Sequence, residues 1–186
     1  MTDSRNCIAF AGSRLVATGE LIDVAQKAKK ALDRDPALAL LIFDDATSEP
    51  IELDLRGSAK DVAERLRQPE AARAPGRPKL GVVPREVTLL PRHWEWLAIQ
   101  PGGASVALRK LVEEARRVHA GRDRVRLAQA AAYRFMSAMA GNEEGFEEAS
   151  RALFAGESHR FTELTAEWPA GVRDHARRLA ARAFAG

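Results

Sequence analysis

The sequence predicts an α+β fold with an N-terminal ββαββα unit, a central short strand-helix-helix and a C-terminal helical bundle. Up to Leu55, apolar residues alternate or run in strand-length blocks around one helix, and after Pro91 they recur at helical spacing. A stretch rich in proline and alanine separates the two patterns. We therefore predict four regions: a small α+β domain (1–68), a linker (69–84), a strand-helix-helix segment (85–118) and a helical domain (122–186).

Two strands and a helix are predicted first. Cys7–Ala11 and Leu15–Thr18 have strand composition, and Gly12-Ser13 between them is typical of a hairpin turn. Glu20–Asp33 is predicted to be a helix, because its apolar residues recur on one face. These are Leu21, Val24, Ala28 and Ala31.

Two further strands and a second helix complete the N-terminal unit. Leu38–Phe43 is a continuous apolar run of strand length. Residues 51–55 alternate between apolar and acidic side chains, which predicts a half-exposed strand, with Asp44–Pro50 as the turn between the two. Ser58 followed by Asp61 resembles a capping box and predicts a helix that ends at the linker.

The rest of the chain is predicted to be helical apart from one strand, Arg85–Leu90. Pro91 suits the first turn of a helix that runs to Ile99. Pro101-Gly102-Gly103 is a turn, and Ala104–Val118 is a second helix with apolar residues at core spacing. The predicted C-terminal helices are Arg124–Ala140, Glu143–Phe154, His159–Glu167 and a last one that is opened by Pro169 and ends near Phe184.

Composition limits the class of protein. The chain has 186 residues, 46% of them hydrophobic, and can bury a core without disulfides or metal. Its single cysteine, Cys7, cannot pair within the chain, so nothing favours an oxidising compartment. No apolar run is long enough for a membrane span, and the short polar N-terminus has no signal core behind it. We expect a cytoplasmic protein without a membrane partner.

Positive charge is concentrated in the middle of the chain. Residues 69–120 contain 9 basic and 5 acidic side chains, whereas residues 1–68 contain 10 and 12. A basic central segment is compatible with nucleic-acid binding, and it is equally compatible with a solvated surface.

Arg85–Arg117 resembles a ribbon-helix-helix DNA-binding module: a short strand, a proline, a helix, a glycine-containing turn and a second helix. The resemblance implies a homodimer in which the strands of two chains pair into a ribbon that lies in the major groove of double-stranded DNA. Such a protein would be a transcriptional regulator or an antitoxin-like protein. The alternative is a non-enzymatic dimerisation or protein-interaction module, in which the strand and Trp94 and Trp96 hold a partner.

The resemblance also suggests which residues contact DNA. If Val87 and Leu89 face the core, strand alternation turns Thr88 toward the bases. Arg85 and Arg92 flank the strand and are expected to reach phosphates. The start of the second helix is expected to present free backbone amides to a phosphate at Gly103, Ala104 and Ser105.

A second DNA-binding hypothesis concerns the linker. Residues 75–79 (PGRPK) resemble part of an AT-hook, the minor-groove motif built around Arg-Gly-Arg-Pro. Arg77 and Lys79 would be its contacting residues, because a narrow A·T-rich groove attracts inserted cations. The competing interpretation is an ordinary proline-rich linker.

Catalytic and metal-binding patterns give no support for an enzyme. The four histidines follow no zinc spacing, and the acidic pairs at 143–148 lack the histidine found in helical metal sites. Cys7 has no basic neighbour in sequence to activate its thiol. We expect no cofactor and no metal, and an enzyme with an unrecognised site ranks last among the functional hypotheses.

Nearly the whole chain resembles a bacterial family, domain of unknown function 2239. The resemblance brings no activity, substrate or catalytic residue with it. The strings that carry it are FDDAT (43–47), DLRGS (54–58), REVTLLPRHWEW (85–96), PGGASVALRKLV (101–112), and Trp168-Pro169 followed by VRD (172–174).

Overall fold

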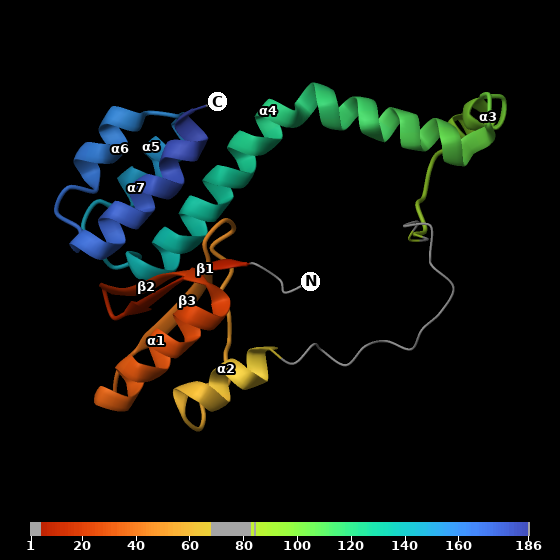
Figure 1. Cartoon of the computed structure of the whole chain (residues 1–186). Helices are drawn as coiled ribbons and strands as arrows, with labels where there is room; N and C mark the ends of the chain where they lie inside the picture. Colours follow the sequence, from red (N-terminus) through yellow and green to blue (C-terminus); the bar gives the residue numbers. More distant parts are fainter. Residues whose placement is uncertain (1–4, 68–82, 84, 186) are drawn as a thin grey trace. The chain divides into compact units, whose positions relative to one another are not determined.

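Three strands form one antiparallel sheet in the computed structural model, which describes residues 5–67, 83 and 85–185. Strand β1 (Asn6–Ala11) lies between β2 (Arg14–Glu20) and β3 (Leu40–Asp44), as Figure 1 shows. β1 and β2 are joined at Gly12, whose positive φ of 55° suits a tight hairpin. The first three predicted strands are therefore confirmed.

The central strand contributes to a different hydrophobic core on each of its faces. Ile8 and Phe10 belong to a core with the C-terminal helices, whereas Cys7 and Ala9 belong to a core with α1 (Leu21–Arg34). This division follows from the alternation of side chains along a strand. Strand β1 is thus buried on both faces, and α1 confirms the predicted first helix.

The predicted fourth strand is wrong. After an isolated bridge between Phe43 and Pro50, residues 51–55 form no strand, although their apolar side chains still pack against the α1 core. The Ile51 amide still donates to the carbonyl of Ile42 in β3 at 2.8 Å, but Asp54 makes other contacts: its carbonyl accepts a hydrogen bond from Arg65, and its carboxylate accepts one from the Arg56 amide at 3.1 Å. These bonds compete with a ladder to β3.

Helix α2 (Ala59–Arg67) begins at the predicted capping box. The amide of Ser58 donates to Asp61 Oδ2 at 2.7 Å, and the amide of Asp61 donates to Ser58 Oγ at 3.2 Å. The reciprocal bonds satisfy two amides that the first helical turn leaves without partners. The Ser58 bonds also hold the pKa of the Asp61 carboxyl below its usual value.

A single helix, α4 (Gly103–Met139), replaces the two helices predicted over Ala104–Val118 and Arg124–Ala140. The gap predicted at 119–123 is helical, because its glycine, Gly121, lowers helix stability without breaking the hydrogen-bond ladder. Ion pairs at i,i+3 spacing support the helix on both sides of Gly121. They join Arg116 to Glu113 at 2.8 Å and Arg126 to Asp123 at 3.1 Å.

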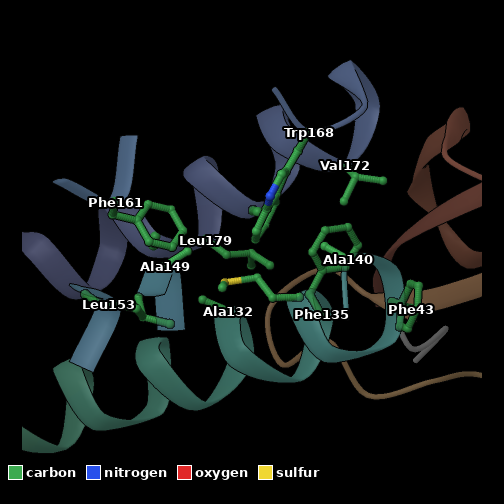
Figure 2. Packing of buried hydrophobic residues seen from close by; sticks show 14 of the residues in the cluster. Phe43, Ala132, Phe135, Ala140, Ala149, Leu153, Phe161, Trp168, Val172 and Leu179 are labelled. Carbon is green, nitrogen blue, oxygen red and sulfur yellow. The ribbon is translucent and has the colours of Figure 1, made fainter. Parts of the chain in front are cut away.

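The C-terminal helices pack around the last part of α4. These are α5 (Phe146–Ala155), α6 (Ser158–Leu164) and α7 (Ala170–Phe184), close to the predicted ranges. Figure 2 shows Phe135 of α4 in this core, and its ring lies 5.4 Å from Phe10 and 5.6 Å from Phe43. The helices and the sheet therefore share one core, which also contains Met136, Leu153, Phe161, Trp168, Val172 and Leu179.

The chain divides into two units. The first comprises Met1–Glu70 and Arg122–Gly186 and contains the sheet and both cores; the second is Ala71–Gly121. In the described ranges, none of the helices combines the length and apolar character needed to cross a membrane.

Candidate nucleic-acid interface

The first helix of the second unit, α3 (Pro91–Ala98), begins where the sequence predicts. Leu90 precedes it in an extended conformation, and its carbonyl accepts a hydrogen bond from the His93 amide at 2.9 Å. Pro91 fits the first helical position because that residue needs no amide hydrogen and its φ is already helical.

A two-glycine turn connects α3 to α4. Gly102 and Gly103 have backbone φ values of 85° and 75°, which residues other than glycine rarely adopt. A Cβ atom at Gly102 would also lie 3.1 Å from the side chain of Val106. The turn therefore fixes the direction in which α4 starts.

The second unit has a small apolar centre. Leu97 of α3 and Ala107 of α4 are its buried residues among those described. Beside them lies an apolar pocket of about 270 Å³, lined by Leu89, His93, Trp96, Leu97, Leu108 and Leu111. The lining places Leu89 on the helix side of the segment 85–90, whereas Val87, which the alternation predicts to face the same way, is 55% exposed.

Large apolar side chains of this unit remain exposed to solvent. Trp96 is 48% exposed and Ile99 is 79% exposed, although both belong to residue types that a folded unit normally buries. The other exposed members among the described residues are Val83, Val87, Leu90, Trp94, Leu111, Val112 and Val118. An apolar surface of this kind usually marks an interface with another molecule.

Segment 85–90 contains two of the residues expected to contact DNA, Arg85 and Thr88. In the described chain it pairs with no strand, so it does not extend the N-terminal sheet. Its pairing with a second copy stays a prediction. Arg85 and Thr88 are exposed, as is Arg92 in the first turn of α3, and neither arginine forms an ion pair with a described residue.

The expected phosphate site at the start of α4 is smaller than predicted. The amide of Gly103 donates to the carbonyl of Gln100 at 2.9 Å and is therefore not free for a phosphate. Ala104 and Ser105 follow it in the first turn, where their amides find no backbone acceptor in the described chain. Ser105 is exposed, and its carbonyl accepts from Arg109 Nε at 3.1 Å. The linker residues Arg77 and Lys79 lie outside the described residues.

The first unit contains a polar cluster that the sequence did not reveal. Arg178 of α7 donates two hydrogen bonds to the carboxylate of Asp45, in the loop after β3, and it contacts Nδ1 of His175 at 2.7 Å. The hydrogen bond from Arg178 holds the pKa of Asp45 below its ordinary value. No spacing rule links residues 133 positions apart, so only the fold shows this pair.

His175 is almost fully buried among aromatic rings. Its ring lies 4.4 Å from that of Phe135 and 5.8 Å from that of Phe10. Burial, reinforced by the charge of Arg178, lowers the pKa of His175 to about 4. The ring is therefore neutral near pH 7, with Nδ1 accepting from Arg178. The other nitrogen, Nε2, has no hydrogen-bond partner among the described residues.

Metal-binding clusters are not found in the part of the chain that the structure describes. The fold defines a mixed α/β protein, and its segment 85–117 exposes both apolar and basic side chains. A family model described as "uncharacterized protein conserved in bacteria", domain of unknown function 2239, matches residues 6–180. The chain belongs to this family. Neither the curated proteins nor the solved structures contain a match.

Proposed function

We propose that this protein is a homodimeric DNA-binding protein, a transcriptional regulator or antitoxin-like protein, that uses residues 85–117 in the manner of a ribbon-helix-helix module. The observation that carries the proposal is the exposure of apolar side chains on the strand-helix-helix unit. A lone unit of this size cannot bury Trp96 and Leu111, whereas a second copy can cover them.

The hydrogen-bonding state of segment 85–90 supports the same arrangement. It has no strand partner in the described chain, and unpaired backbone groups favour pairing with another strand. Since Leu89 lines the apolar pocket, alternation assigns Thr88 to the opposite side. In the proposed ribbon, that side faces the base edges of the major groove.

The charged groups around segment 85–90 also support DNA binding. Arg85 and Arg92 flank the proposed ribbon, and neither has an ion-pair partner among the described residues. The amides of Ala104 and Ser105 add a helix N-terminus that favours an anion. In the proposal, these groups bind phosphates on either side of Thr88, with Gly103 fixing the helix start; Arg77 and Lys79 add linker contacts.

A mobility-shift assay with pooled genomic duplex fragments at low salt tests this proposal. We expect retardation that weakens as salt rises, because phosphate contacts release counterions. Absence of retardation for every duplex at low salt would contradict DNA binding.

The second candidate is a protein-interaction module that binds no DNA, and the exposure of Trp94 and Trp96 favours it. Aromatic anchors of this type commonly dominate protein interfaces. This candidate predicts self-association or partner binding that survives Arg85→Ala and Arg92→Ala and is lost with Val87→Pro. The DNA-binding proposal predicts that the two arginine substitutions weaken retardation while the dimer persists.

A further inference from the structure

A basic pocket lies between α1 and the edge strand β2, within the first unit. Its volume is about 370 Å³, within the size range of small-molecule sites. Four cationic side chains line it: Arg14 from β2 and Lys27, Lys30 and Arg34 from α1. The three α1 residues share one helix face because they are spaced three or four positions apart.

The positive charge of this pocket is not balanced by the acidic groups around it. None of the four cations forms an ion pair with a residue in the described ranges. Asp35 is the one acidic residue in the lining, and its carboxylate accepts a hydrogen bond from the Ala37 amide at 3.1 Å. The nearby Asp33 is paired with Lys29, outside the pocket. Four cations facing one carboxylate create a strongly positive local potential.

The remaining lining of the pocket is apolar. Val16, Ala31 and Leu38 are partly buried and belong to the lining between the charged groups. Val16 lies where the pairing of β1 and β2 shifts register: Ala9 pairs with Ala17 and Phe10 with Leu15, which leaves Val16 as the additional residue. Such a bulge redirects side chains at the edge of a sheet.

We propose that this pocket binds a small phosphorylated molecule, with its phosphate groups on the four cations and its organic part against Val16 and Leu38. Lysine and arginine together suit a multiply charged phosphate, since arginine offers a planar fork of donors and lysine a compact charge. The concave shape favours a small molecule over the backbone of a duplex. The proposal does not depend on DNA binding by the second unit.

Isothermal titration calorimetry of the full-length protein with phosphate, pyrophosphate, AMP and ATP tests this site. We expect ATP to bind more tightly than AMP because it carries more charge, and more tightly than pyrophosphate because it adds an apolar contact. The double variant Lys30→Gln/Arg34→Gln should weaken ATP binding by at least about tenfold, since each substitution removes a charge-assisted contact. A matched double variant, Lys60→Gln/Arg160→Gln, removes two exposed cations elsewhere in this unit and should bind ATP normally.

Methyl chemical shifts of the unmodified protein provide a readout that needs no variant. ATP should shift the signals of Val16 and Leu38 and leave the methyl groups of Leu153 unchanged, because Leu153 is buried in the other core. Absence of heat and of shifts at millimolar ATP would overturn the proposal. Equal ATP binding by both double variants would also overturn it. A third outcome would also overturn it: the unmodified protein binds no ATP, and Lys30→Gln/Arg34→Gln loses duplex DNA binding. The pocket would then belong to a DNA surface.

Discussion

Arg178 on the last helix forms an ion pair with Asp45, a residue in the loop that follows β3. Nη1 of Arg178 lies 3.0 Å from Asp45 Oδ2, and Nη2 donates to the other carboxylate oxygen. Arg182 contributes a second cation at 3.7 Å. Asp45 lies in the string FDDAT, and Arg178 lies one helical turn after the string VRD in α7.

Breaking the pair with Arg178→Gln should lower the free energy of unfolding by about 1–2 kcal/mol, since the bond is charge-assisted and partly shielded from water. The contribution of Asp45 is complete above its ordinary pKa of 3.8 and is lost as pH falls through its lower folded pKa. Urea unfolding at pH 7 measures the effect. Arg151→Gln removes an exposed pair with Glu148 and serves as the control; an equal decrease in both variants would contradict the account.

His175 predicts a different dependence on pH. Its folded pKa of about 4 lies below the ordinary value of 6.5, so between these values the unfolded chain binds more protons than the folded one. The free energy of unfolding should therefore fall as pH drops from 6.5 to 4, by up to about 3 kcal/mol. His175→Phe should flatten this slope, and the exposed His159→Gln should not. An unchanged slope in His175→Phe would show that another group is responsible.

Alanine substitutions at two glycines of the α3–α4 region should have opposite effects on the free energy of unfolding. Gly102→Ala should destabilise the second unit by about 1–3 kcal/mol, because φ is 85° and the new Cβ would press on Val106. Gly121→Ala should stabilise α4 by about 0.5–1 kcal/mol, since the position is helical and nothing lies within 4 Å. Thermal unfolding followed by circular dichroism distinguishes them. Destabilisation by Gly121→Ala would contradict a continuous helix.

The exposed apolar surface of the second unit predicts self-association. Leu111→Asp should convert the protein to a monomer in sedimentation-velocity experiments, because it places a charge beside the apolar pocket. Leu127→Asp, on an exposed position of α4 in the first unit, should leave the dimer intact. A monomeric unmodified protein, or equal behaviour of the two variants, would contradict the dimer.

Local sequence patterns predicted most helices and three of the four strands expected in the N-terminal unit. The capping residues Ser58 and Asp61, and Pro91 at a helix start, act within a few residues and could therefore be recognised in the sequence. The predicted strand at 51–55 failed because its polar residues bond within their own segment and to Arg65, a tertiary contact. The predicted gap at 119–123 is wrong because the favourable helix on both sides outweighs the cost of Gly121.

The candidate sites depended even more on tertiary structure. The residues expected at the DNA surface lie between positions 77 and 105, so their nearness in sequence was enough to predict a common surface. Three cations of the basic pocket share one face of α1, but the fourth, Arg14, comes from β2, and Asp45 and Arg178 lie 133 positions apart. No periodic pattern connects residues of different elements.

The most direct test of the central claim compares the salt dependence of duplex DNA binding in the unmodified protein and in Arg85→Ala/Arg92→Ala. Fluorescence anisotropy between about 50 and 200 mM salt gives the slope of log affinity against log salt. We predict weaker binding and a shallower slope, reduced by about 1 for each phosphate that the variant no longer neutralises. The matched variant Arg151→Ala/Arg160→Ala should keep the original slope. No binding by the unmodified protein, or an identical slope in both double variants, would contradict DNA recognition through residues 85–117.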